Sequence, residues 1–186
     1  MRTVYLWSIV VMLIAPFVVV LGVSIGDSKS IAFPPAALYD AWYIELLTEA
    51  EWLAAIGRSL LIALIAGVIA TTLALAINYV LWRTGSSFAK ATFALGLGPF
   101  LLPPIILALG ASLFWAEVGW YGRMEATIVS HGVFFVTLPL VIIARGFAAL
   151  TDEVIEAAQM MGATSAQVIR TIVLPLIAPY VFTGFA

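Results

Sequence analysis

The sequence predicts an all-α fold, a polytopic bundle of transmembrane helices. Hydrophobic residues occupy 64% of the 186 positions, and charged residues occupy only 10%. Several apolar runs are longer than the ~18 residues that mark a membrane-spanning helix. A soluble core could not hide this much apolar surface, so the composition indicates an integral membrane protein.

Four complete spans follow from the positions where about 20 apolar residues run without an unpaired charge. They are residues 4–25, 59–82, 91–115 and 126–144. A fifth span begins in residues 174–186, a stretch shorter than the ~20 residues that a crossing needs. We interpret the first span as a retained helix, because its apolar stretch is longer than the h-region of a typical signal peptide.

The basic residues that flank these spans favour a cytoplasmic N-terminus. In that orientation more of these basic residues lie on the cytoplasmic side (the inner set) than on the outside (the outer set). The inner set comprises Arg2, Arg83, Lys90, Arg145 and Arg170, and the outer set comprises Lys29, Arg58 and Arg123. The segment between the fourth and fifth spans, residues 145–173, is then predicted to be cytoplasmic.

The segment between the first two spans, residues 27–57, is predicted to lie outside the cell at the membrane surface. Its Phe33-Pro34-Pro35 run cannot continue a helix. Aromatic residues at Trp42-Tyr43 and Trp52 are suited to a helix that lies in the interface. Interfacial anchoring is one reading of these aromatics, and contact with a soluble partner protein is the other.

Prolines predict broken helices in the third and fourth spans. Pro99, Pro103 and Pro104 fall within the third span, and Pro139 falls near the cytoplasmic end of the fourth. Each proline removes an amide donor, and backbone groups freed at membrane depth must be satisfied by protein or water. These positions therefore mark either a solute pathway or kinked helices that only pack.

The composition and motifs argue against several classes of protein. His131 is the only histidine and cysteine is absent, so the chain is not expected to hold a metal. A net charge of −2 does not favour nucleic-acid binding. Neither a phosphate-binding loop nor a His-Glu-x-x-His motif occurs, so we expect no catalytic residues. Thr127, Ser130 and Thr137 are predicted to form hydrogen bonds between helices.

Residues 145–173 predict two short helices joined by a glycine turn. Thr151 is a candidate N-cap, and Gly162 suits the left-handed position that ends a helix. Thr164 and Gln167 form a capping-box pattern at the start of a second helix, which is expected to end before Pro175. The apolar stripe of the first helix consists of Val154, Ile155, Ala157, Ala158 and Met161.

The same segment carries a long spaced pattern. Glu156-Ala157-Ala158 is followed after three residues by Gly162, and after nine more by Ile172-Val173-Leu174-Pro175. This pattern resembles the cytoplasmic "EAA" loop of permease subunits of binding-protein-dependent ABC importers, the MetI-like superfamily. Trp42-Tyr43, Trp52 and Ser59-Leu60 look most like the corresponding segment of the spermidine/putrescine-type permeases.

The resemblance implies a type I ABC importer permease in the bacterial plasma (inner) membrane, C-terminally truncated, without enzymatic activity of its own. It implies that residues 145–173 dock on a dimer of ABC ATPase subunits, which bind the ATP and Mg, so that this chain needs no cofactor. Other implied partners are a second permease subunit, homologous or identical, a periplasmic or extracellular substrate-binding protein, and membrane lipid. The coupling residues that it implies are Glu156, Ala157, Ala158, Gly162, Ile172, Leu174 and Pro175.

The implied substrate is a polyamine such as putrescine or spermidine. Another small solute such as an inorganic anion is the alternative. A membrane assembly protein that does not transport would share the bundle but would bind no ATPase.

Overall fold

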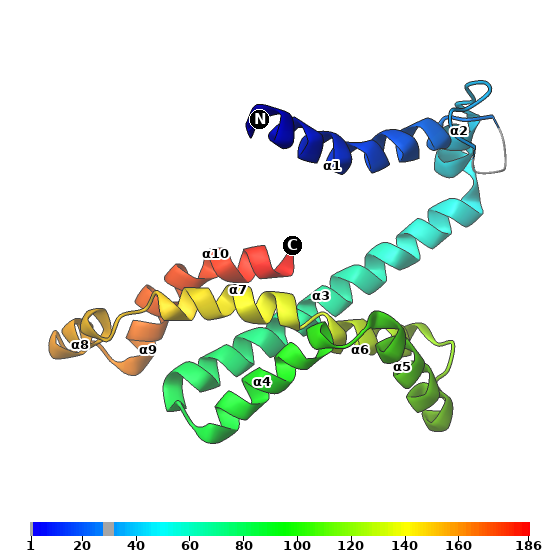
Figure 1. Ribbon diagram of the computed structural model, residues 1–186. Helices are drawn as coiled ribbons and strands as arrows, with labels where there is room; N and C mark the ends of the chain where they lie inside the picture. Colours follow the sequence, from blue (N-terminus) through cyan, green and yellow to red (C-terminus); the bar gives the residue numbers. More distant parts are fainter. Residues whose placement is uncertain (1, 28–31) are drawn as a thin grey trace. The chain divides into compact units, whose positions relative to one another are not determined.

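The computed structural model describes residues 2–27 and 32–186, and these residues are mostly helical, without a named strand (Figure 1). The all-α prediction is therefore confirmed. Lys29, which we assigned to the outer basic set, lies outside the described residues. The chain forms two compact units, Met1–Arg58 and Ser59–Ala186.

Among the described residues, three helices are long and apolar enough to cross a membrane, and the number rises to five if each of two bent helix pairs is one span. The three single helices are Thr3–Ser24, Ala50–Thr84 and Ser165–Phe185. The two bent pairs correspond to the predicted third and fourth spans.

In the first unit, helix α1 spans Arg2–Ser24 and helix α2 spans Ala41–Thr48. Gly26 and Leu38 form an isolated antiparallel bridge between them. The Trp42 indole N–H donates to the Gly26 carbonyl at 3.0 Å. An aromatic residue of the predicted interfacial segment thus fastens the start of α2 to the end of the first span.

Helix α3 spans Ala50–Thr84, which is longer than the predicted second span. We expected Trp52 to belong to a surface helix, but it lies in the first turn of α3. Glu49 ends α2 with extended backbone, and no proline follows until Pro99, so α3 begins at once and continues to Thr84. Among the described residues of this segment, α2 is the one separate short helix.

The predicted third span is broken into helix α4, Ser87–Leu101, and helix α5, Pro104–Val118, which are bent by 107° from each other. Pro103 is the N-cap of α5, and Pro104 follows at its first position. Two consecutive prolines lack the amide hydrogens that would continue α4, so the helix ends before them. The broken helix predicted here is confirmed.

The predicted fourth span consists of helix α6, Met124–Phe134, and helix α7, Thr137–Ala148, with a bend of 41°. We expected the kink at Leu138-Pro139, but it lies at Phe135 and Val136. Pro139 has no N–H to donate to the carbonyl of Phe135, four residues earlier, so the kink appears one turn before the proline.

The second helix of the predicted hairpin does not end before Pro175. Helix α9, Ser165–Val168, continues through a π-helical segment, Ile169–Val173, into helix α10, Leu174–Phe185. Leu174 N–H donates to the Ile169 carbonyl five residues earlier. This wider turn relieves the clash that a proline ring makes in an α-helix, so Pro175 is accommodated in the first turn of α10.

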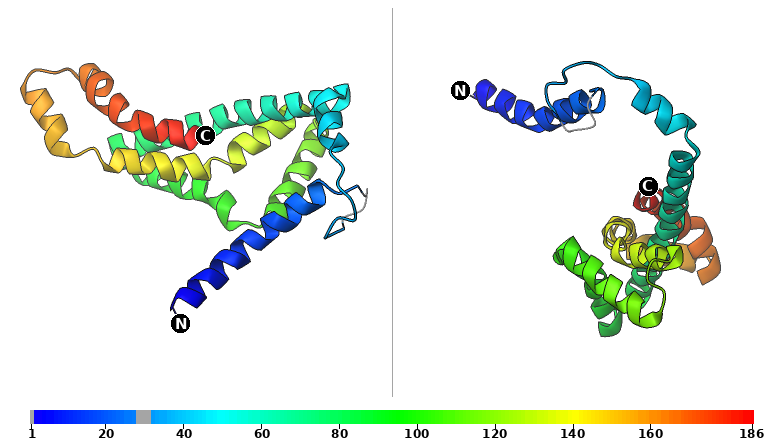
Figure 2. Two further views of the ribbon diagram at one scale, coloured as in Figure 1. Left: turned by 90° about the horizontal axis from the view of Figure 1, so that it is seen from above. Right: turned by 90° about the vertical axis from the view of Figure 1, so that its right-hand side faces the viewer.

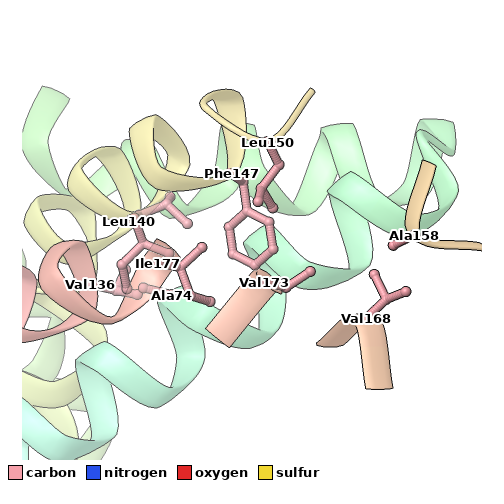
Figure 3. Packing of buried hydrophobic residues seen from close by; sticks show 10 residues of the cluster. Ala74, Val136, Leu140, Phe147, Leu150, Ala158, Val168, Val173 and Ile177 are labelled. Atoms are coloured by element: carbon pink, nitrogen blue, oxygen red, sulfur yellow. The ribbon is translucent and has the colours of Figure 1, made fainter. Parts of the chain in front are cut away.

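The core lies in the second unit, where α10 packs along α7 (Figure 2). Leu140 and Ile143 of α7 and Ile177 of α10 are almost completely buried there. Figure 3 shows the side chains of this core. Its residues are Ala74, Val136, Leu140, Ile143, Phe147, Leu150, Ala158, Val168, Val173 and Ile177.

Candidate functional site

The turn after helix α8, Asp152–Met160, is a complete Schellman motif. Gly162 has φ +89°, a conformation that favours glycine. Its N–H donates to the Gln159 carbonyl at 2.9 Å, and Ala163 N–H donates to the Ala158 carbonyl at 3.0 Å. The predicted left-handed conformation of Gly162 is confirmed, and the end of α8 is held by two backbone hydrogen bonds.

The capping box predicted at the start of α9 is also present. Thr164 N–H donates to Gln167 Oε1 at 2.8 Å, and Gln167 N–H donates to Thr164 Oγ1 at 3.3 Å. Only Ala163 separates this cap from the glycine turn. We call residues 152–168 the α8–α9 hairpin, whose bend is fixed by hydrogen bonds on both sides.

The N-terminus of α8 carries negative charge. Thr151 occupies the N-cap with extended backbone, and Asp152 and Glu153 lie in the first turn. Two hydrogen bonds lower the pKa of the Glu153 carboxyl below its ordinary value. The larger effect comes from the backbone N–H of Glu153 itself, and the smaller effect comes from the side chain of Thr151. The charge also interacts favourably with the helix dipole.

The two faces of α8 differ. Ala158 is only 7% exposed, and Ile155 packs against the same core. Glu156 and Ala157 are exposed, as is Gly162 in the turn. The exposed face of α8 therefore presents the Glu156 carboxylate beside the small side chain of Ala157. Three residues of the predicted apolar stripe, Val154, Ala157 and Met161, do not pack against the core but are exposed. Met160 beside them is exposed as well, and the exposed fractions of Met160 and Met161 are 83% and 84%.

The remaining residues of the spaced pattern divide in the same way. Ile172 packs partly buried against the core, while Leu174 and Pro175 are exposed. The pattern thus brings together two kinds of residue. Ala158 and Ile172 pack in or against the core, and Glu156, Ala157 and Gly162 stay accessible on the outside of the hairpin.

The core continues from the hairpin into the spans. Ala158 of α8 and Val168 of α9 belong to the same cluster as Phe147 of α7 and Ala74 of α3 (Figure 3). Phe147 also contacts Trp82 of α3, with ring centroids 5.7 Å apart. The hairpin therefore shares one packed core with α7 and α3.

A second feature is a cavity of about 760 Å³ at the break between α4 and α5. Of the prolines predicted to mark a pathway or a helix break, Pro99 and Pro104 line this cavity, and Pro103 lies between α4 and α5 as the N-cap of α5. Pro139 is buried, and a Cβ added at Gly184 of α10 would lie 3.1 Å from it. Pro139 therefore serves packing and not the cavity.

Hydrogen bonds between helices follow the sequence prediction in part. Thr137 Oγ1 donates to the Gly96 carbonyl of α4 at 2.7 Å, and Ser130 Oγ accepts from the Trp115 indole of α5 at 2.7 Å. Thr127 instead donates within its own helix, to Arg123. The sequence analysis missed Asn78, a buried amide in α3 that its position inside an apolar span could have revealed.

Comparisons with known proteins identify a family. The family described as "Binding-protein-dependent transport system inner membrane component" matches residues 88–186, which include the cavity and the hairpin. The putrescine transport system permease protein PotI of Escherichia coli is 30% identical over 96% of this chain and 68% of the relative. The sulfate transport system permease protein CysT of Salmonella typhimurium is 27% identical over 78% of this chain and 57% of the relative.

The match covers more than half of this chain, and the all-α bundle with its apolar helices agrees with it. The chain belongs to the family of inner membrane components of binding-protein-dependent transport systems, the ABC importer permeases.

Proposed function

We propose that this chain is the membrane-spanning subunit that forms part of the solute pathway of an ABC importer and is driven by a separate ATPase through the α8–α9 hairpin. The family match over residues 88–186 carries this proposal. In this proposal the ATP and Mg are bound by a dimer of the ATPase, and a second permease subunit and a substrate-binding protein complete the importer. The N-terminus is cytoplasmic, in a bacterial inner membrane.

The outside of the hairpin supports the docking role. Glu156 offers an exposed carboxylate to a basic partner, and Ala157 permits close approach of a partner surface. Met160 and Met161 add flexible apolar side chains beside them. The fixed turn at Gly162 makes this surface rigid, and the shared core connects it to α7.

Putrescine or a related polyamine is the proposed substrate. The alignment with the putrescine permease PotI extends over 96% of this chain. The alignment with the sulfate permease CysT extends over 78%, which makes an inorganic anion the second candidate. Uptake of radiolabelled putrescine and of radiolabelled sulfate by cells that express the whole transport system discriminates between the two.

Co-purification tests the coupling role. The chain is expressed with a candidate ABC ATPase subunit of the same organism and purified from membranes as wild type and as Gly162→Pro. Proline cannot adopt the φ of +89° found at Gly162, so the variant loses the Schellman turn. The ATPase is expected to co-purify with the wild type and not with Gly162→Pro.

The matched control is Gly85→Pro. Gly85 has φ +54° in the turn between α3 and α4, and it lies outside the hairpin. Gly85→Pro is expected to retain the ATPase, although it too places proline at a left-handed position. Equal retention by both variants would show that the hairpin is not the contact. A chain that never retains an ATPase would support the alternative of a membrane assembly protein.

A further inference from the structure

The break between α4 and α5 leaves two carbonyl oxygens without their usual donors. In a continuous α-helix, the amides of residues 103 and 104 would donate to the carbonyls of Pro99 and Phe100. Both residues are proline and have no N–H. Pro99 and Phe100 line the cavity of about 760 Å³. The break therefore leaves two backbone acceptors without helical donors at residues that line the cavity.

His131 adds a third acceptor to the cavity wall. Its Nδ1 lies 2.8 Å from the Thr127 carbonyl oxygen, which can only accept a hydrogen bond. Nδ1 must therefore carry the proton. In the neutral imidazole, Nε2 then has a free lone pair, and it is the nitrogen that is left to meet a ligand.

Aromatic side chains form much of the remaining wall. Trp115 and Tyr121 both line the cavity. The Trp115 indole N–H already donates to Ser130 Oγ, and its ring stacks on Trp120 with centroids 5.6 Å apart, so this residue offers the other part of its ring and not a donor. Aromatic rings attract alkylammonium groups through their electron-rich faces.

The positive charge in the wall has a carboxylate partner outside the cavity. Arg123 lines the cavity and forms an ion pair with Glu125 at 3.2 Å. Its guanidinium also lies 5.2 Å from the centroid of the Trp120 ring. Among the lining residues that the structure describes there is no Asp or Glu. Carbonyl oxygens and an imidazole lone pair repel an oxyanion, whereas each of them accepts a hydrogen bond from an ammonium group.

From these groups we infer that the cavity at the α4–α5 break is a binding site for the ammonium end of a linear aliphatic amine. The Pro99 and Phe100 carbonyls and His131 Nε2 accept its hydrogen bonds, and Trp115 and Tyr121 contact its aliphatic chain. A volume of about 760 Å³ is ample for such a ligand. This inference rests on the proposed function as a polyamine permease and assigns the substrate a site within this chain.

Equilibrium binding of radiolabelled putrescine to the purified permease–ATPase complex, without the substrate-binding protein, tests the site. His131→Phe removes the acceptor and keeps an aromatic ring, and His131→Gln keeps an acceptor oxygen. A hydrogen bond to a charged group corresponds to a change in Kd of about tenfold or more. We expect that loss for His131→Phe, near wild-type binding for His131→Gln, and no competition by sulfate.

Variants of Ser112 provide a second test of the site in case the His131 variants fail to assemble. It lines the cavity and donates only within its own helix, to the Ala108 carbonyl at 2.8 Å. Ser112→Lys is expected to weaken putrescine binding, because it adds a positive charge, and Ser112→Asp is expected to strengthen it. The opposite order, or equal binding by both, would overturn the amine site.

Uptake by the whole transport system separates the two proposals. If the wild type takes up putrescine and neither the His131 nor the Ser112 variants change its binding, the site is wrong and the polyamine function stands. If the wild type takes up sulfate and not putrescine, the polyamine function is wrong and the amine site fails with it. Retention of the ATPase by each variant shows that the complex has assembled.

Discussion

The side-chain amide of Asn78 in α3 donates a hydrogen bond to the Leu140 carbonyl of α7 at 3.0 Å. The same nitrogen donates to the Ala74 carbonyl of its own helix at 2.9 Å. Asn78 is 2% exposed, and Leu140 is fully buried. The two hydrogen bonds satisfy both donors of the amide and join α3 to the helix that leads to the hairpin.

Asn78→Asp tests this contact with almost no change of shape. The carboxylate cannot donate, and it would face two carbonyl oxygens in the core as a buried unpaired charge, so we expect a loss of about 3 kcal/mol or more in the free energy of unfolding at neutral pH. Protonation restores a single donor, so part of the loss should be recovered in acid. Unfolding in mixed detergent and sodium dodecyl sulfate, followed by circular dichroism, measures both effects.

Asn78→Leu is the control for that experiment, because leucine also lacks the donors but cannot titrate. Its free energy of unfolding should show no recovery in acid relative to the wild type. If Asn78→Asp is as stable as the wild type at neutral pH, the contact between α3 and α7 contributes nothing to the bundle.

Thr137→Val addresses the neighbouring contact between α7 and α4. Valine keeps the shape of threonine and loses the hydrogen bond to the Gly96 carbonyl. Because hydrogen bonds between membrane helices contribute about 1 kcal/mol, we expect a loss of that size in the same unfolding assay.

The control for Thr137→Val is Thr92→Val. Thr92 donates to the Phe88 carbonyl within α4 and joins no second helix. Its replacement should leave the free energy of unfolding nearly unchanged. Equal losses for the two variants would mean that valine destabilises any of these helices, whichever helix the threonine contacts.

The hairpin could be predicted from the sequence because its determinants are local. The capping box joins Thr164 to Gln167, three residues apart, and the turn depends on the left-handed backbone of Gly162. The break before Pro104 was predictable for the same reason, since two adjacent prolines end a helix wherever they occur.

Contacts between distant residues were not predictable in this way. Asn78 and Leu140 are 62 positions apart, and nothing in either neighbourhood specifies the other. The predicted stripe also did not distinguish Ala158 from Ala157, because it covers more than one face of α8. Membership of Ala158 in the same core cluster as Val168 identifies the inner face.

Glu153 predicts a pH dependence of the hairpin. Its pKa in the folded chain is lowered, so its stabilising contribution is present above the ordinary glutamate pKa and is lost as the pH falls through the lowered value. Thr151→Val removes one of the two hydrogen bonds, so the Glu153 pKa should rise toward its ordinary value. Carbon-13 NMR of the labelled carboxyl in detergent micelles measures this pKa.

Thr164→Val provides the comparison for Thr151→Val. It removes the cap of α9, which does not contact Glu153, and should leave the Glu153 pKa unchanged. A Glu153 pKa that is the same with and without the Thr151 hydroxyl would show that the backbone N–H alone lowers it.

Gly132→Ala tests how closely α6 packs on α3. A Cβ at Gly132 would lie 2.7 Å from Ile69 Cγ2 and 2.9 Å from Ile69 Cβ. Ile69 is branched at Cβ and cannot turn this part of its side chain away, so the helices must separate. Overpacking of this kind costs about 1–3 kcal/mol, of which the better helix propensity of alanine offsets up to about 1 kcal/mol.

Gly110→Ala is the matched control for Gly132→Ala, because a Cβ at Gly110 of α5 meets nothing within 4 Å and no proline follows it in the helix. It should gain stability, by up to about 1 kcal/mol, because alanine is the better helix former. The two variants should therefore shift the free energy of unfolding in opposite directions in the detergent assay. A gain for both would mean that α6 has room beside Ile69, and the close approach of α6 to α3 would have to be rejected.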